Sequence, residues 1–427
     1  MMPQTNKRMP KNSSCIKVLK NAMILDCINE HPYRGAIVIE KNLIKAVIDH
    51  NEDTFPQGAD IYDLDGKFIL PGLIDAHVHI ICSDPDIGLQ MRKDPVSLMT
   101  IKALDVLKSD LDQGFTCVRD CGGADSGLRT ALEENIIAGP KLKVSGRHLS
   151  MTGGHGDGRW PAELFDPIRS PSTFHGIVVD GVDSVRKASR EQLRQGADFI
   201  KVMAGGGCMS PSDKIESSQY SQDELGAIVW EAESCGTYVS AHCYSDRSVL
   251  NSINAGIRTI EHGNLISKTG AKALKQVGAY LVPTLSAYHI AGQDANKKSG
   301  LPDVYIKKIR KAGKKSFESL KIAFETGCTI GSGSDILGPD QKRKKALELE
   351  LKATVMGSYN AIKSATIVNA QMMGIDKEIG SLRPGKIADM IVVDGNPIND
   401  ISILQNFEQT IVCVIKDGEF HKSAFPI

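Results

Sequence analysis

The sequence predicts an α/β protein, a (β/α)8 TIM barrel with a small β-sandwich built from both chain ends. One local pattern recurs along the middle of the chain: a helical stretch, a glycine, and then a short apolar run. Alternating helices and strands favour a parallel sheet, and eight such runs favour closure into a barrel. The two ends of the chain instead carry consecutive short β runs separated by turn residues. The alternative for the middle is an open, doubly wound sheet.

Glycine marks the end of most of the predicted helices. A glycine just past a helix adopts the left-handed conformation at little steric cost. In the stretch before Gly236, the apolar residues Leu225, Ile228, Val229 and Ala232 share one helical face. The expected barrel strands are 67–70, 115–118, 142–145, 199–202, 237–240, 257–260, 280–282 and 328–330.

The chain ends are predicted to form one domain together. Near the start, 36–39 and 46–48 are apolar β runs, and near the end 389–395 and 412–415 resume the pattern. Neither end has enough strands for a domain of its own. We therefore expect a composite β-sandwich domain from 1–66 and 370–427, and a barrel domain from 67–369.

Composition narrows the class of partner. The 427 residues are 41% hydrophobic and 24% charged, and 51 Lys and Arg balance 51 Asp and Glu. Because nucleic acids and anionic membranes select a basic excess, neither is expected as a partner, and a small molecule is. The first twenty residues lack an apolar signal-peptide core, and the ten cysteines lack CxxC spacing. These features predict a cytoplasmic location.

Candidate metal ligands follow the predicted strands. His77 and His79 come after the first strand, and residues i and i+2 of an extended segment point the same way. His242, His262 and Asp335 end the fifth, sixth and eighth strands. The carboxyl ends of barrel strands form the active face. Neutral imidazoles and a carboxylate converging there suit Zn²⁺ or a similar ion.

Lys201 lies in the apolar fourth strand, 199–203. An unpaired ammonium is costly to bury, and burial favours the neutral amine. A neutral amine reacts with CO₂ to give a carbamate, whose two oxygens would bridge two metal ions. The alternative is a lysine paired with a nearby carboxylate.

As a set, these residues and one longer motif resemble the amidohydrolase superfamily in its binuclear form. The motif is Pro71-Gly72-Leu73-Ile74-Asp75-Ala76-His77-Val78-His79. The resemblance covers nearly the whole chain, because 385–389 looks like the family's return to its β-sandwich. It implies two divalent ions per chain, with zinc expected. By resemblance, His77 and His79 bind the more buried ion, carboxylated Lys201 bridges both, His242 and His262 bind the outer ion, and Asp335 contacts the buried ion and shuttles protons.

A narrower resemblance concerns 146–156 and 201–211. These segments are similar to the branch that contains Xaa-Pro dipeptidases, other dipeptide carboxypeptidases and ochratoxin-hydrolysing amidohydrolases. One departure is Ser334, where threonine is common, although a hydroxyl remains. Relatives in this branch commonly assemble, which implies a homo-oligomer.

The expected function is hydrolysis of an amide or peptide bond to an amino acid with a free carboxylate. A metal-bridging hydroxide would attack, and Asp335 would take its proton and pass it to the departing nitrogen. Tyr244, His148 and His155 are the candidate substrate-binding residues, each with a structural role as the alternative; Arg159 and His289 are weaker candidates. A cyclic-amide hydrolase of the imidazolonepropionase type is the alternative function.

Overall fold

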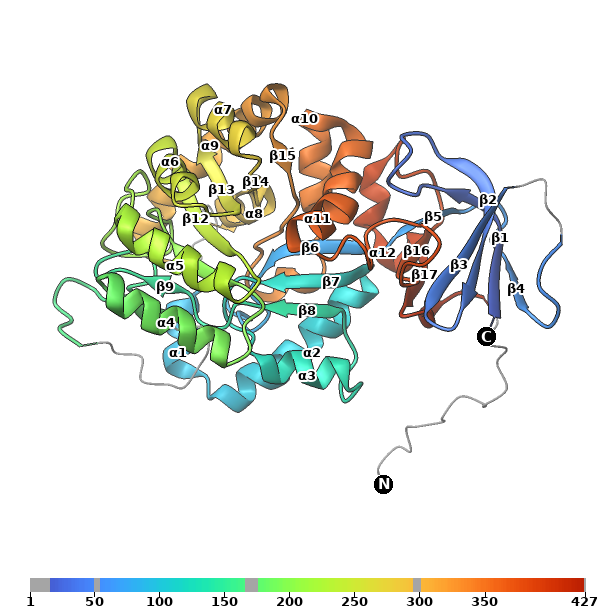
Figure 1. The fold of residues 1–427 in the computed structure, drawn as a ribbon, viewed down its shortest axis with the longest axis horizontal. Helices are drawn as coiled ribbons and strands as arrows, with labels where there is room; N and C mark the ends of the chain where they lie inside the picture. Colours follow the sequence, from blue (N-terminus) through green and yellow to red (C-terminus); the bar gives the residue numbers. More distant parts are fainter. Residues whose placement is uncertain (1–15, 50–53, 166–175, 295–300, 426–427) are drawn as a thin grey trace.

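The computed structural model describes residues 16–49, 54–165, 176–294 and 301–425. Within these ranges the chain has an α/β fold whose strands form three sheets. Figure 1 shows helices lying outside the parallel strands and a separate β region at one end of the molecule. The α-helices are α1 (Ile87–Lys93), α2 (Val96–Asp112), α3 (Ser126–Glu133), α4 (Val182–Arg194), α5 (Gln222–Ser234), α6 (Asp246–Asn254), α7 (Lys268–Val277), α8 (Leu285–Asp294), α9 (Asp303–Thr326), α10 (Leu347–Lys363), α11 (Asn369–Met373) and α12 (Phe407–Thr410). Shorter helical turns are the 3₁₀ segments η1 (Gly338–Lys342) and η3 (Ile401–Leu404) and the π-helical η2 (Ser364–Val368).

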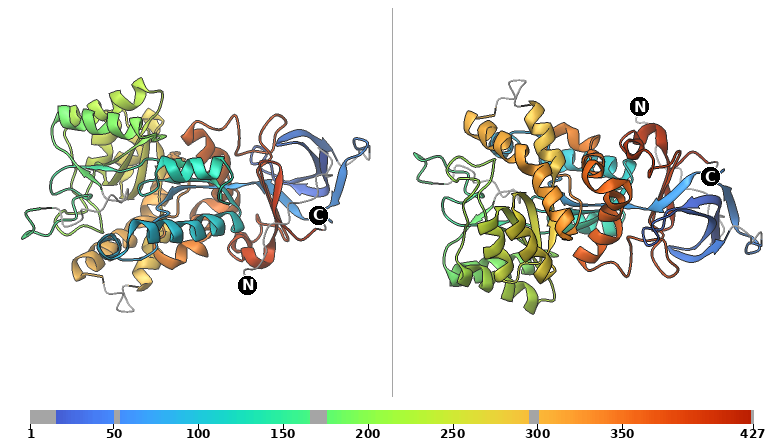
Figure 2. Two further views of the ribbon diagram at one scale, coloured as in Figure 1. Left: turned by 90° about the horizontal axis from the view of Figure 1, so that it is seen from below. Right: turned by 90° about the horizontal axis from the view of Figure 1, so that it is seen from above.

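One eight-stranded sheet contains strands from both ends of the chain. Its order is β18-β17-β16-β5-β1-β2-β3, with β4 paired to β1. The central contact is antiparallel, with Met390 of β16 opposite Pro71 of β5. In both views of Figure 2, the first and last parts of the chain lie together in this sheet. The strands are β1 (Ile16–Ile24), β2 (Tyr33–Glu40), β3 (Leu43–Asp49), β4 (Asp60–Asp63), β5 (Phe68–Pro71), β16 (Met390–Val393), β17 (Ile411–Lys416) and β18 (Glu419–Ser423).

The parallel strands form two further sheets. Their orders are β6-β7-β8 and β10-β9-β11-β12-β13-β14-β15. Backbone hydrogen bonds connect the two sheets: Asp198 N–H, just before β11, donates to Val144 O of β8 (2.7 Å), and Asp335 N–H, beyond β15, donates to His77 O of β6 (2.8 Å). The strands are β6 (Leu73–Val78), β7 (Phe115–Asp120), β8 (Lys141–Val144), β9 (Leu149–Ser150), β10 (Ile177–Val178), β11 (Ile200–Met203), β12 (Val239–Ser245), β13 (Thr259–Leu265), β14 (Tyr280–Val282) and β15 (Thr329–Ile330).

The strand predicted at 67–70 was assigned to the wrong sheet. Its counterpart β5 pairs with β1 and β16 in the terminal sheet, and β6 is the strand that leads into the His77 motif. All four residues of β5 are buried, and a short apolar strand fits either sheet equally well. The pairing is decided by long-range contacts that the local pattern does not contain.

Capping residues mark the start of α5 and the end of α9. Ser221 and Glu224 form a capping box at the start of α5, and the buried face of that helix includes Leu225, Ile228, Val229 and Ala232. Gly327 ends α9 in the left-handed conformation, with φ 83°. Such a φ strains residues with a side chain, which explains the glycine.

None of the described helices is long and apolar enough to cross a membrane.

Candidate metal centre and active site

A cavity of about 510 Å³ lies at the carboxyl ends of the parallel strands. Every metal ligand and substrate-binding residue predicted from the sequence contributes to its lining. These residues come from β6, β11, β12 and β13, from the segments that follow β6, β9 and β15, and from the segment between β8 and β9. The set comprises His77, His79, His148, His155, Lys201, His242, Tyr244, His262 and Asp335.

His77 and His79 are held with one ring nitrogen facing Asp335. The Nδ1–H of His77 donates to Glu261 Oε2, and that of His79 donates to Gly122 O, each over 2.7 Å. Carboxylate and carbonyl oxygens only accept, so both Nε2 atoms present a lone pair. They lie 3.7 and 3.4 Å from Asp335 Oδ1. The i, i+2 spacing therefore does bring both imidazoles to one point.

His242 and His262 extend this group of imidazoles. Their ring centroids are 4.4 Å apart, and His262 is 5.0 Å from His77. The Nε2–H of His242 donates to Gly206 O over 3.1 Å, which leaves its Nδ1 as the lone pair. Burial lowers the pKa of His77 to about 4 and the pKa values of His242 and His262 well below 6.5. All are therefore neutral at pH 7, the form in which histidine binds metal ions.

Asp335 sits in a backbone turn that is held from several sides. Its φ is 49°, a left-handed conformation that is uncommon outside glycine and asparagine. Asp75 accepts the N–H of Ser334 over 2.9 Å and the hydroxyl of Ser334 over 2.5 Å. Ser286 Oγ donates to Ser334 O over 2.8 Å. Burial raises the pKa of the Asp335 carboxyl to about 8, against the lowering effect of Lys201.

Lys201 is 1% exposed, and its Nζ has no hydrogen-bond partner among the described residues. Buried polar atoms are almost always satisfied, so such an atom needs an explanation. Lys201 lines the same cavity as the imidazoles. The ligand atoms of His77, His262 and Asp335 lie within 4.8 Å of one another. The donor set and the unsatisfied amine together fit divalent ions and a group attached to Nζ.

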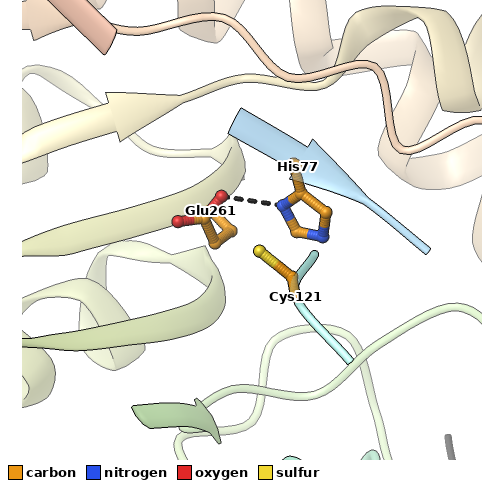
Figure 3. A group of neighbouring side chains, drawn as sticks. All are labelled: His77, Cys121 and Glu261. Atoms are coloured by element: carbon orange, nitrogen blue, oxygen red, sulfur yellow. Dashed lines mark hydrogen bonds and ion pairs between the residues drawn. The ribbon is translucent and has the colours of Figure 1, made fainter. Parts of the chain in front are cut away.

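A second cluster beneath the site is better explained by hydrogen bonds than by a metal ion. His77, Cys121 and Glu261 also place ligand atoms within 4.8 Å of one another (Figure 3). Burial raises the pKa of the Cys121 thiol to about 12, so the thiolate is not formed. Glu261 already accepts hydrogen bonds from His77, Arg119 and Ser240. Its role is to orient His77.

The three candidate substrate-binding residues surround the imidazoles. His155 packs on His242 with centroids 4.3 Å apart, and its Nδ1 lies 2.9 Å from Ser210 Oγ. Only glycine fits at 207, because a Cβ there would lie 2.1 Å from the His155 ring. The Tyr244 hydroxyl lies 2.6 Å from the Tyr288 hydroxyl. His148 is 5% exposed and also faces the cavity.

The weaker candidates lie elsewhere. Arg159 donates to both carboxylate oxygens of Asp157, over 2.8 and 2.6 Å, and His289 contacts Gln293 over 2.9 Å. Neither residue lines the cavity.

Comparison with known proteins identifies the family. The amidohydrolase family model matches residues 68–420. The chain belongs to the amidohydrolase family. It is 30% identical over 367 residues to the ochratoxinase of Aspergillus niger, covering 83% of this chain and 75% of the relative.

Solved structures of similar proteins support the same family assignment. A prolidase complexed with N-methylphosphonate-L-proline is 38% identical and has a TM-score of 0.91, covering 96% of this chain and 100% of the other. A Xaa-Pro dipeptidase with bound methionine in its active site is 28% identical, with a TM-score of 0.86 and the same coverage. This amidohydrolase is therefore a hydrolase of the branch predicted from its motifs, and amide or peptide hydrolysis is its reaction class.

Two features of this amidohydrolase's site were not predicted. Tyr288 lies on α8, and nothing in the sequence indicates which face of that helix meets the cavity. Glu261 directly precedes His262. A carboxylate within an otherwise apolar strand was the sequence signal that could have identified Glu261 as part of the site. Its position between Arg119 and His77 depends on contacts between β6, β7 and β13.

Proposed function

We propose that this protein is a binuclear metal-dependent amidohydrolase that cleaves the amide bond to an amino acid with a free carboxylate. The observation that carries the proposal is the convergence of six candidate ligands on one cavity, with a buried, unsatisfied amine among them. Six positions exceed what one tetrahedral ion needs. They are His77, His79, Lys201, His242, His262 and Asp335.

In this proposal Lys201 carries a carbamate formed with CO₂, and the ions are Zn²⁺. His77, His79 and Asp335 would hold one ion and His242 and His262 the other, and a carbamate on Lys201 would supply further oxygen ligands. Bound divalent ions supply a water of lowered pKa and polarise the scissile carbonyl. By accepting the Nδ1–H of His77, Glu261 leaves the Nε2 lone pair of His77 free to bind an ion.

In this proposal Asp335 transfers the proton from the attacking water to the departing nitrogen. Its carboxylate Oδ1 lies 3.4 Å from His79 Nε2, and Asp335 also lines the cavity, so it borders both the candidate metal ligands and the space for the substrate. It accepts a proton from the attacking water and delivers it to the departing nitrogen. The restrained turn around Ser334 holds the carboxylate in place for both transfers.

Tyr244, His148 and His155 hold the free carboxylate of the leaving amino acid. All three line the cavity, and the ring centroids of Tyr244 and His155 lie 4.8 and 4.3 Å from that of His242. The Tyr244 hydroxyl lies 2.6 Å from that of Tyr288 and donates to Cys208 Sγ over 3.5 Å. A thiol is a weak acceptor, so a substrate carboxylate would take over this hydroxyl hydrogen. Fixing the carboxylate orients the amide, and orientation supplies several kcal/mol of a reaction barrier.

We also propose that the two parallel sheets close into a (β/α)8 barrel. The hydrogen bonds from Asp198 to Val144 and from Asp335 to His77 support it, because they join the two sheets at two separate places.

Two measurements test the function. Elemental analysis of undepleted protein should find about two divalent ions per chain; one ion or none contradicts the binuclear site. An N-acyl amino acid should be hydrolysed in strong preference to its C-terminal amide. Equal rates for both, or activity on cyclic amides alone, would overturn carboxylate recognition.

A further inference from the structure

Two buried tyrosines lie with their hydroxyls together in the cavity. This inference rests on the proposed function and concerns how the Tyr244 hydroxyl is held. Tyr244 of β12 is 2% exposed and Tyr288 of α8 is 7% exposed, and both line the cavity. Burial raises the pKa of both phenols well above 10, so each keeps its single hydroxyl hydrogen at neutral pH.

The hydroxyl hydrogen of Tyr244 already has an acceptor, because this hydroxyl donates to Cys208 Sγ over 3.5 Å. The Tyr244 hydroxyl also lies 2.6 Å from the Tyr288 hydroxyl, a distance at which one hydrogen lies between the two oxygens. Since a phenol has one hydrogen and that of Tyr244 goes to Cys208, Tyr288 is the donor to Tyr244. Tyr288 therefore has no hydrogen left for a substrate while this contact lasts.

The surroundings of the two phenols strengthen this chain of hydrogen bonds. Tyr244, Tyr288 and Cys208 belong to one buried apolar cluster. In such surroundings a hydrogen bond is stronger than in water, and a hydroxyl that accepts a hydrogen bond becomes a better donor. The first turn of α8 is anchored by Ser286, whose N–H and hydroxyl donate to Glu348 Oε2 over 2.8 and 2.9 Å. Packing and this anchor hold the Tyr288 hydroxyl against Tyr244.

We propose that Tyr288 is a positioning residue for Tyr244. By donating to Tyr244, it prevents the Tyr244 hydrogen from turning towards Tyr288 and keeps that hydrogen for another acceptor. Cys208 is this acceptor in the free protein, and the substrate carboxylate replaces it, because a thiol accepts only weakly. Tyr288 acts on the substrate only through Tyr244.

Tyr288→Phe removes the donor and keeps the ring. With metal-replete protein and N-acetyl-L-phenylalanine, we expect KM to rise about three- to tenfold with little change in kcat, because a contact made equally in the ground and transition states is weakened. For the C-terminal amide of this compound, kcat/KM should fall much less, since a neutral amide accepts a weaker hydrogen bond than a carboxylate. The control is Tyr305→Phe. Tyr305 lines the same cavity but stacks on Trp160, with ring centroids 6.3 Å apart, so KM should not change.

A double-variant cycle shows whether Tyr288 acts through Tyr244. Tyr244→Phe alone should raise KM for the acid about tenfold or more, because a hydrogen bond to a charged group is lost. The acceptor of the Tyr288 hydrogen is then absent as well. Adding Tyr288→Phe to Tyr244→Phe should therefore leave KM unchanged.

Cys208 provides a second test with two variants of opposite effect. Cys208→Ser places a stronger acceptor beside the Tyr244 hydroxyl, which competes with the substrate carboxylate and should raise KM about twofold or more. Cys208→Ala removes the competing acceptor and should leave KM equal to that of the wild type or lower.

Four results would overturn the inference and leave the proposed function intact. An unchanged KM in Tyr288→Phe is the first. An equal loss of kcat/KM for the acid and the amide in that variant is the second, since it would reduce Tyr288 to a structural role. The third is a further rise in KM when Tyr288→Phe is added to Tyr244→Phe, and the fourth is a KM in Cys208→Ser no higher than in Cys208→Ala. Hydrolysis of neither compound by the wild type would overturn the proposed function as well.

Discussion

Two buried lysines in this chain have opposite surroundings. Lys352 is fully buried, and its Nζ donates to Gly331 O and Ser364 Oγ, each over 2.6 Å. Lys201 is equally buried, and its Nζ has no such partner among the described residues. Burying an amine without a hydrogen-bond partner lowers the stability of the fold. Lys352 is therefore explained by its structural contacts, whereas Lys201 needs a functional explanation.

Lys201→Ala should lose both metal and activity. In the proposed site this change removes the ligand that the two ions would share, so we expect metal content to fall below about one ion per chain and kcat/KM to fall about a hundredfold or more. Acetate or propionate should restore part of both by replacing the carbamate oxygens. Lys352→Met is the control: it should cost about 1–3 kcal/mol of stability and retain the metal. Full metal content in Lys201→Ala would refute the bridge.

Asp335→Asn should nearly abolish turnover while the fold survives. Asparagine tolerates the left-handed φ of 49°, so the turn is retained. Its amide binds metal weakly and accepts no proton, so kcat should fall about 10²–10⁴-fold. Steady-state kinetics on metal-replete protein measures this. A loss below about tenfold would assign the proton transfer to another group.

At the scale of elements, the segment after β15 depends on residues from β6 and α8. Asp75 holds Ser334 by two hydrogen bonds and lies 3.8 Å from the buried ammonium of Lys345. Lys345 also contacts Asp110 of α2 over 2.8 Å. Asp75 is thus a positioning residue for Asp335, whereas Asp110 contacts the same lysine without contacting Ser334.

Asp75→Asn should lower kcat with little change in KM. The amide nitrogen of asparagine cannot accept a hydrogen bond, so the Ser334 hydroxyl has to rotate and accept from it instead. The charge that strengthens both bonds to Ser334 is lost as well, so Asp335 is held less firmly. We expect about a tenfold fall in kcat, together with about 1–3 kcal/mol of lost stability. Asp110→Asn is the control, with a similar loss of stability in urea unfolding and an unchanged kcat. Equal kcat values in the two variants would reduce Asp75 to a structural role.

The elements also show what the sequence can and cannot predict. The positions of His77, His79, His242 and His262 followed from strand ends, because side-chain direction in a strand is a local property. The sheet to which β5 belongs did not follow, because its four buried residues suit either sheet. Tyr288 was missed for a related reason: the facing side of a helix is set by tertiary packing.

At the scale of the whole molecule, the terminal sheet is joined to the parallel strands by charged contacts. Lys141 of β8 lies 2.7 Å from both Asp389 and Asp417. Asp389 immediately precedes β16, and Asp417 immediately follows β17. These contacts attach the terminal sheet to β8. The sheet itself needs both chain ends, because β5 pairs with β1 on one side and with β16 on the other.

Assembly stays a prediction from the family resemblance. We expect a homo-oligomer, and light scattering at micromolar concentration measures it directly. A particle of 46.2 kDa, the mass of one chain, would refute it.

The contact between Asp112 and His421 joins α2 to β18 and should make stability depend on pH. His421 Nε2 donates to Asp112 Oδ1 over 3.1 Å, and Lys108 donates to Oδ2 over 2.7 Å. The hydrogen bond from His421, aided by Lys108, lowers the pKa of Asp112 from 3.8 to about 2. A carboxyl whose pKa is lower in the folded protein stabilises the fold above its unfolded pKa and loses that contribution as the pH falls towards 2.

Asp112→Ala should therefore cost about 1 kcal/mol at pH 6, after allowing for screening by solvent, and progressively less below about pH 4. Urea unfolding of both proteins between pH 6 and the lowest pH at which the wild type folds measures the difference. Asp105→Ala is the control, because Asp105 lies on the same helix with its side chain 74% exposed and 3.7 Å from Lys342. Its loss should cost less than about 0.5 kcal/mol at any pH. If the free energy of unfolding lost in Asp112→Ala stays constant down to the lowest pH, the contact between α2 and β18 acts through packing. In that case the Asp112 charge does not hold the terminal sheet in place.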